Sequence, residues 1–173
     1  EGKAMISAAT VLVVDDDPGM RTTLAAVLED EGYQVITCQS GGEALRYISD
    51  ESPADVVITD LNLPDISGLE ILTSLNGSRP DAIFILMTGN ATVETAVEAV
   101  NQGAFAYHLK PLDMDALINS VRHGLEQQHL LVENRNLLNR LQQFNKELEQ
   151  ARDIALEASR AKSDFLATMS HEI

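Results

Sequence analysis

The chain has 173 residues, of which 45% are hydrophobic, so it is long enough for one domain with a buried core and a further segment. Its formal net charge of −15, from 27 acidic and 12 basic residues, argues against binding to nucleic acid or to anionic membrane surfaces. A single cysteine, Cys38, excludes an internal disulfide, and no apolar run reaches the roughly 20 residues of a membrane span. No signal-peptide pattern opens the chain, and we therefore expect a cytoplasmic protein without membrane insertion.

Residues 1–8 are expected to be a disordered or cloning-derived N-terminus, with Met5 as a candidate native start. Beyond them, short apolar runs alternate with amphipathic segments. The runs predicted as strands are Val11–Val14, Val35–Ile36, Val56–Ile58, Ile83–Met87 and Phe105–Leu109. Four helix-like segments open on a capping residue or proline, at Pro18, Ser40, Ser67 and Thr92. This alternation predicts an α/β domain over residues 9–125, with a five-stranded, doubly wound parallel sheet of flavodoxin-like order.

Polar residues follow the predicted strands at the end where a doubly wound sheet binds its ligands. The first strand ends in Asp15-Asp16-Asp17, the third in Asp60, the fourth in Thr88-Gly89 and the fifth in Lys110-Pro111. Carboxylates that converge in one crevice repel one another and favour a cation, and an all-oxygen site suits Mg²⁺. A carboxylate can also attack phosphorus when a metal ion and a lysine neutralise the moving oxygens. Asp17 is interpreted as a helix-terminal charge before Pro18.

The order and spacing of these residues resemble the phosphorylation site of response-regulator receiver domains, over about residues 8–125. The resemblance implies that Asp60 is the phospho-acceptor. It also implies that Asp15 and Asp16 hold Mg²⁺ together with Asp60 and the backbone carbonyl of Asn62.

The same resemblance assigns the remaining site residues. Thr88 and Lys110 are expected to contact the phosphoryl group, and Thr88 and Tyr107 to form a two-state switch. The Lys110–Pro111 peptide bond is expected to be cis. His108 stands where the family usually has an aliphatic residue, and we interpret it as structural.

After Pro111 the pattern predicts one continuous helix from Asp113 to near His171, about 85–90 Å long at 1.5 Å per residue. Its heptad seam, broken by polar residues at Asn134 and Lys162, runs through Leu130, Asn134, Leu137, Leu141, Phe144, Leu148, Ala151, Ala155, Ala158, Lys162, Phe165 and Met169. We expect a second copy of the chain to cover this seam, as a parallel coiled-coil homodimer over residues 126–160. A competing stripe leaves open whether some residues pack instead on the globular domain or on its dimer mate: Leu117, Val121, Leu125, Val132 and Leu138.

Residues 161–173 read AKSDFLATMSHEI and resemble the phospho-acceptor box of sensor histidine kinases. The resemblance implies that His171 is a phospho-acceptor and that Glu172 orients its imidazole or accepts its proton. With Phe165 and Met169 in the seam, His171 lies roughly 200° from Met169 around the helix at about 100° per residue, and so points to solvent. The box is expected to be a truncated phospho-acceptor helix, because no ATP-binding domain is recognisable in the chain.

These patterns together predict a two-component phosphorelay protein. Asp60 would accept a phosphoryl group from a phosphohistidine donor protein, and the coiled coil would carry the signal to a kinase module. The intact protein would then be a histidine kinase, whereas this chain lacks the catalytic domain. Two alternatives stay open: a dimerisation and docking module, or a phosphate sink that controls no kinase.

Overall fold

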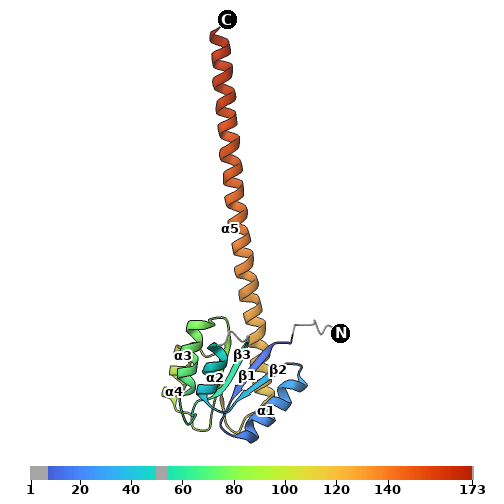
Figure 1. The fold of residues 1–173 in the computed structure, drawn as a ribbon, viewed down its shortest axis with the longest axis vertical. Helices are drawn as coiled ribbons and strands as arrows, with labels where there is room; N and C mark the ends of the chain where they lie inside the picture. Colours follow the sequence, from blue (N-terminus) through green and yellow to red (C-terminus); the bar gives the residue numbers. More distant parts are fainter. Residues whose placement is uncertain (1–7, 50–53, 173) are drawn as a thin grey trace. The chain divides into compact units, whose positions relative to one another are not determined.

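The computed structural model describes residues 8–49 and 54–172. The expected N-terminal segment 1–8 lies outside them except for Ala8, and so does Ile173 at the end of the kinase-like box. The chain divides into two compact units, Glu1–His129 and Leu130–Ile173. Figure 1 shows the elements of both units in chain order.

The first unit contains a single parallel sheet with strand order β2-β1-β3-β4-β5. The strands are β1 (Thr10–Val14), β2 (Gln34–Cys38), β3 (Val56–Asp60), β4 (Ile83–Thr88) and β5 (Ala106–Leu109). The helices are α1 (Pro18–Asp30), α2 (Gly41–Ser49), α3 (Gly68–Ser78), α4 (Val93–Asn101) and α5 (Met114–His171). The predicted fold class is confirmed, including the long C-terminal helix.

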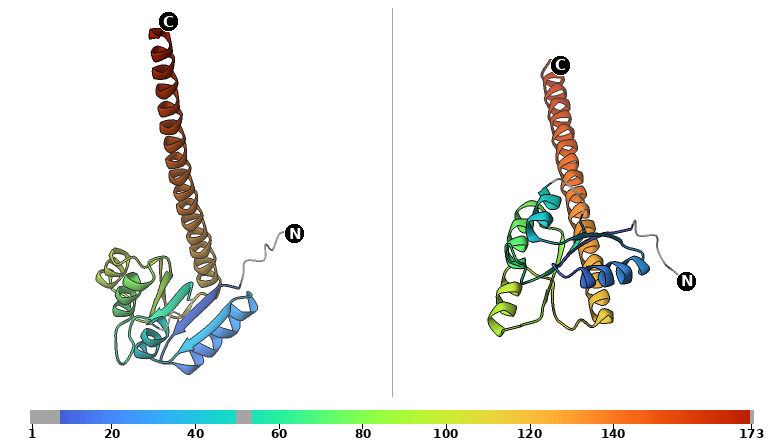
Figure 2. Two further views of the ribbon diagram at one scale, coloured as in Figure 1. Left: turned by 45° about the horizontal axis from the view of Figure 1, so that its top comes forward. Right: turned by 60° about the horizontal axis from the view of Figure 1, so that its bottom comes forward.

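Alternating side chains of the central strands supply two separate hydrophobic cores. On β1, Leu12 and Val14 face α2, α3 and α4, whereas Val11 and Val13 face α1 and α5. Figure 2 shows these helices on the two sides of the sheet. Strands β1 and β3 are buried along their whole length, as expected for the centre of a doubly wound sheet.

The capping residues explain where three helices begin. Asp17 caps α1 through its carboxylate, which accepts from the Gly19 N–H, and Pro18 occupies the first turn. Ser67 caps α3 in the same way. Thr92 forms a capping box with Thr95 at the start of α4. The interpretation of Asp17 as a helix-terminal residue is therefore confirmed.

Helix α5 has two kinds of surroundings along its length. Leu117 and Val121 are buried against the sheet, and Leu125 packs beside them, so these members of the competing stripe belong to the core of the first unit. Near this end, the Gln128 side chain donates a hydrogen bond to the Asp81 carbonyl at 2.6 Å. Every described residue from 130 to 172 is exposed in the single chain. Among the described helices, none combines the length and the apolar character of a membrane span.

Candidate functional site

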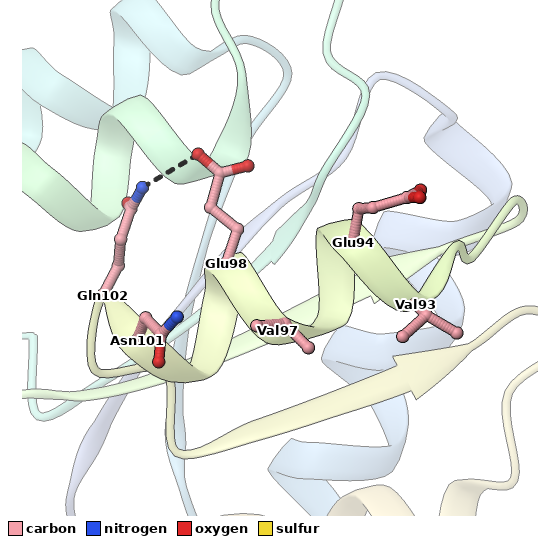
Figure 3. A pocket seen from close by; sticks show the side chains of 6 residues that line it. All are labelled: Val93, Glu94, Val97, Glu98, Asn101 and Gln102. Atoms are coloured by element: carbon pink, nitrogen blue, oxygen red, sulfur yellow. Dashed lines mark hydrogen bonds between the residues drawn. The ribbon is translucent and has the colours of Figure 1, made fainter.

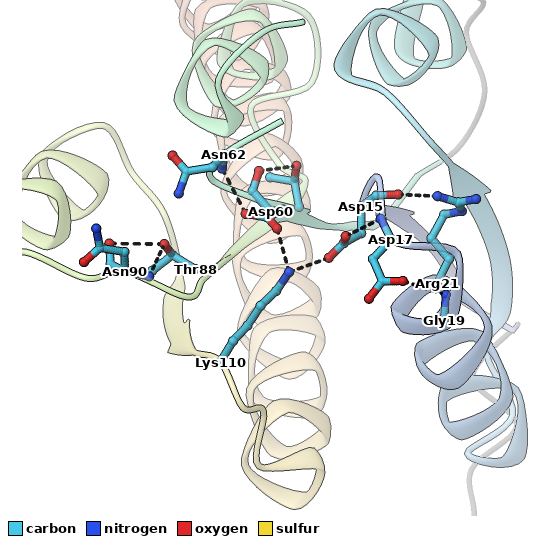
Figure 4. A network of polar contacts seen from close by, with 10 residues as sticks. Asp15, Asp17, Gly19, Arg21, Asp60, Asn62, Thr88, Asn90 and Lys110 are labelled. Carbon is cyan, nitrogen blue, oxygen red and sulfur yellow. Dashed lines mark hydrogen bonds and ion pairs between the residues drawn. The ribbon is translucent and has the colours of Figure 1, made fainter. Parts of the chain in front are cut away.

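The strand register brings the predicted site residues to one edge of the sheet. Val14 pairs with Thr59, and Asp60 pairs with Met87, so β1, β3 and β4 end together. Thr88 in turn pairs with Leu109 at the end of β5, which places Lys110 at the same edge. Figure 4 shows the side chains of Asp15, Asp60 and Lys110 converging at this edge.

The carboxylates of Asp15, Asp16 and Asp60 form a cluster whose nearest oxygens lie within 4.8 Å of one another. Asp15 is fully buried and Asp60 is 7% exposed, whereas Asp16 lies at the surface. Such close like charges are unfavourable unless a cation compensates them. The donor set consists only of hard oxygen atoms and carries excess negative charge, so it fits Mg²⁺.

The Lys110 ammonium joins two of these carboxylates. Its Nζ lies 2.8 Å from Asp15 Oδ2 and 2.6 Å from Asp60 Oδ2. Burial lowers the pKa of Lys110, but the hydrogen bonds with Asp15 and Asp60 outweigh it, and the net result is a raised pKa. Lys110 therefore stays positively charged at neutral pH. The Lys110–Pro111 bond is cis, as the resemblance implies.

The backbone around Asp60 fixes the plane of its carboxylate. The Asn62 N–H donates to Asp60 Oδ1 at 2.9 Å, while Oδ2 is held by Lys110. Gly68, the first residue of α3, lies so close behind that an added Cβ would be 2.6 Å from the Asp60 carbonyl oxygen. Only glycine fits there, because any side chain would push α3 away from the end of β3.

Each of the two predicted switch residues has a polar partner. Thr88 is fully buried, and its hydroxyl accepts from the Asn90 N–H at 3.2 Å. The Tyr107 hydroxyl lies 3.1 Å from the hydroxyl of Thr95, a member of the α4 capping box. Thr88 is thus engaged with its own loop, and Tyr107 with α4.

Two residues at the pocket were not anticipated from the sequence. Arg21 on α1 donates to the backbone carbonyl of Asp15 at 2.6 Å, and Asn90 engages Thr88. Arg21 is the only basic residue of α1, and it follows the acidic triplet by one helical turn, which is a usable sequence signal. For Asn90 no comparable signal exists, since its partner is defined by the turn after β4.

The other residues singled out in the sequence are not members of the acidic cluster. His171 ends α5 and Glu172 follows it, both exposed in the second unit. His108 Nε2 lies 2.8 Å from the Ser120 hydroxyl, consistent with its structural interpretation. Burial raises the pKa of the Cys38 thiol to about 11, so the thiol stays protonated. An open pocket along α4, lined by Val93, Val97 and their neighbours, contains none of the predicted site residues (Figure 3).

Comparison with known proteins matches this geometry to one family. The sequence model of the response regulator receiver domain matches residues 11–122. The transcriptional regulatory protein GlrR of Escherichia coli K12 is 38% identical over 119 residues, which is 69% of this chain and 27% of that protein. The transcriptional regulator NtrC of Azospirillum brasilense is 38% identical over 120 residues, 69% of this chain and 25% of that protein. The chain thus spans about a quarter of the length of these curated relatives.

Solved structures give the same match. A CheY-like receiver domain protein from Methanospirillum hungatei is 33% identical, with a TM-score of 0.68 over 71% of this chain and 98% of that chain. NtrX from Brucella abortus is also 33% identical, with a TM-score of 0.69 over 75% of this chain and 30% of that chain.

Proposed function

The chain belongs to the response regulator receiver domain family, and we propose that Asp60 accepts a phosphoryl group from a phosphohistidine donor protein in a Mg²⁺-dependent reaction. The observation that carries this proposal is the Lys110 ammonium, which bridges Asp60 and Asp15 at one carboxylate cluster. A cation fixed beside a nearly buried carboxylate provides the positive charge that a transferring phosphoryl group requires.

The residues of the cluster divide the chemistry among them. Asp60 attacks phosphorus, the phosphorus–nitrogen bond of the donor breaks, and the imidazole leaves with its bonding electron pair to take up a proton. Asp15, Asp16, Asp60 and the Asn62 carbonyl would hold Mg²⁺, which supplies charge neutralisation on the phosphoryl oxygens. The product is an acyl phosphate on Asp60.

The switch is proposed to follow from a change of hydrogen-bond partners. The new phosphoryl oxygens compete for the Lys110 ammonium and for the Thr88 hydroxyl, which now pairs with Asn90. Movement of Thr88 frees space towards Tyr107, whose hydroxyl is bonded to Thr95 on α4. Phosphorylation would thereby shift β5 and α4 between two packed arrangements.

The test is labelling with a small phospho-donor such as acetyl phosphate in the presence of Mg²⁺. The chain should gain one acid-stable, base-labile phosphoryl group, and Asp60→Asn should gain none, because an amide is a poor nucleophile. Asp55→Asn is the matched control, since Asp55 directly precedes β3 at the opposite end from Asp60. Full labelling of Asp60→Asn would contradict the assignment.

For the second unit we propose a parallel coiled-coil homodimer that carries the signal to a histidine kinase module. The support is the row of exposed apolar side chains along α5, among them Leu141, Phe144 and Leu148, followed by the box that contains His171. In the full-length gene product, ATP should then label His171, and His171→Gln should abolish this label while His123→Gln retains it. The chain alone should take no label from ATP. Labelling at another residue would refute the kinase interpretation.

A transcription-regulating output is the second candidate, because the matched curated relatives are named transcriptional regulators. Their similarity covers 69% of this chain and about a quarter of their own length, so it supports the receiver and leaves the output open. The labelling experiment on the full-length product separates the two candidates. A product that binds a specific DNA duplex and takes no label from ATP favours the transcriptional output.

A further inference from the structure

The segment between β3 and α3 is tied to the start of α2 by one carboxylate. Asp65 Oδ1 accepts from the Gly41 N–H at 3.0 Å, and Asp65 Oδ2 accepts from the Gly42 N–H at 2.7 Å. These amides belong to the first turn of α2, where no carbonyl of the helix can reach them. The hydrogen bond from Gly42 and the further backbone bonds lower the pKa of Asp65, so the group is ionised at neutral pH.

Close packing keeps the same two segments in register. An added Cβ on Gly41 would lie 2.2 Å from Ile66 Cγ1, so only glycine fits under this side chain. Ile66 and Leu63, from the same segment as Asp65, pack against the hydrophobic core beneath. The contact between the β3–α3 segment and the start of α2 therefore combines the apolar packing of Ile66 with the hydrogen bonds of Asp65.

This contact is part of a series of hydrogen bonds that links the two segments carrying Asp15 and Asn62. On one side, the Asp15 N–H donates to the Cys38 carbonyl at 3.2 Å, just before the turn that leads into α2. On the other side, the Asn62 N–H donates to Asp60, and Asn62 forms a β-bridge with Ser67. The β2–α2 turn thus connects the strand end that carries Asp15 with the segment that carries Asn62.

We propose that Asp65 is a positioning residue for the acidic pocket: by binding the start of α2, it holds the β3–α3 segment and the Asn62 backbone where the pocket needs them. This inference rests on the proposed function of Asp60. Asp65 acts at a distance, since its own oxygens bind Gly41 and Gly42 and not the cluster. Groups that orient metal ligands from the second layer typically change metal affinity by about 10-fold or more when they are removed.

The test compares Asp65→Ala and Asp65→Asn with wild type and with Asp55→Ala. Asp55 is a matched control, because its carboxylate also accepts a backbone N–H from a remote segment, that of Thr10 at 2.9 Å, but at the other end of β3. Mg²⁺ affinity is measured by calorimetry, and the rate of labelling by acetyl phosphate is measured as a function of Mg²⁺. Amide hydrogen exchange of residues 61–68 is followed without Mg²⁺.

Asp65→Ala should bind Mg²⁺ roughly 10-fold more weakly, and its segment 61–68 should exchange faster. The labelling rate at saturating Mg²⁺ should stay close to that of wild type. Asp65→Asn retains one acceptor oxygen, so its Mg²⁺ affinity should lie between those of wild type and Asp65→Ala. Asp55→Ala should leave Mg²⁺ affinity unchanged.

Unchanged Mg²⁺ affinity in Asp65→Ala overturns the inference, even if the segment exchanges faster. An equal loss of affinity in Asp55→Ala also overturns it, because the effect would then reflect stability alone. A wild-type chain that neither binds Mg²⁺ nor takes label refutes the proposed function, and the inference falls with it. If the wild-type chain binds Mg²⁺ and is labelled while either of these variant results is found, only the inference fails and the proposed function stands.

Discussion

Leu117 and Leu141 lie in the same helix, yet their surroundings differ completely. Leu117 is 1% exposed against the sheet, whereas Leu141 is 59% exposed in the second unit. Up to about Leu125, the apolar face of α5 is covered by the chain's own sheet. From Leu130 onward the described chain offers no cover of its own. The comparison teaches that one unit completes its core alone, whereas the apolar row of the other is left uncovered by the single chain, which is the reason for proposing a second copy as its cover.

The largest expected effect concerns the core of the first unit. Phe84 on β4 is 1% exposed and lies within the core that faces α2, α3 and α4, so Phe84→Ala should cost about 3–5 kcal/mol of unfolding free energy. Urea unfolding followed by tyrosine fluorescence reports on this unit, since all three tyrosines precede residue 130. Phe144→Ala is the matched control from the second unit and should leave this transition in place. Equal losses in the two variants would contradict the comparison.

The second effect concerns association of the chain. In the proposed dimer Phe144→Ala removes burial worth about 2 kcal/mol from each chain, or about 4 kcal/mol per dimer, which should raise the dissociation constant roughly 1,000-fold. Sedimentation equilibrium of wild type and of Phe144→Ala measures the shift in the dissociation constant. A wild-type chain that remains monomeric at roughly tens of micromolar removes the basis of the dimer proposal.

Cross-linking sharpens the same prediction by testing whether the predicted seam faces its own copy. Leu148→Cys places a thiol in the seam of the proposed parallel dimer, and it should form a disulfide between chains under mild oxidation. The native Cys38 serves as an internal control, because it is buried and burial raises its pKa to about 11. Cross-links through Cys38, or none at residue 148, count against the parallel arrangement.

Much of the first unit was predictable because its determinants are local. Near-continuous apolar runs predicted the strands, and the carboxyl-end rule for parallel sheets predicted that Asp15, Asp60 and Lys110 lie together. The contact of Asp65 with Gly41 and Gly42 was not predictable, because it joins segments whose approach depends on the finished packing. No periodicity or spacing in the sequence encodes such pairings.

The second unit shows the opposite limit of sequence analysis. Heptad spacing predicted a long helix, and the helix is present. The face of that helix that would contact a partner depends on how two chains pair, and a single sequence does not encode this. Of the competing stripe, only residues that the sheet buries, such as Leu117 and Val121, can be assigned to the first unit. The registry of the seam from Leu130 onward therefore stays a prediction for the cross-linking experiment.

A smaller effect is expected at the acidic cluster. Without Mg²⁺, Asp16→Asn should stabilise the first unit by roughly 0.5 kcal/mol, because it removes one of three crowded negative charges at a partly solvated site. Excess Mg²⁺ should stabilise wild type more than the variant, since binding to the folded state raises stability. Melting temperatures with Mg²⁺ and with EDTA give both comparisons. Equal stabilisation of both proteins by Mg²⁺ would place the metal elsewhere.

The smallest effect is a pH dependence within the first unit, where β5 meets the buried part of α5. His108 is half-buried, and burial lowers its pKa, an effect that Asp113 partly offsets. Its Nε2 pairs with the Ser120 hydroxyl, which itself donates to the Ala116 carbonyl.

Because the folded pKa of His108 lies below the unfolded value of about 6.5, the unfolded chain binds the proton more readily. The stability contributed by neutral His108 is present above that unfolded value and is lost as pH falls through the folded pKa. His108→Gln should therefore flatten the fall of melting temperature from neutral to mildly acidic pH. His123→Gln, which replaces an exposed histidine of α5, is the control. Parallel pH profiles for wild type and His108→Gln would show that the proton is not coupled to the contact between β5 and α5.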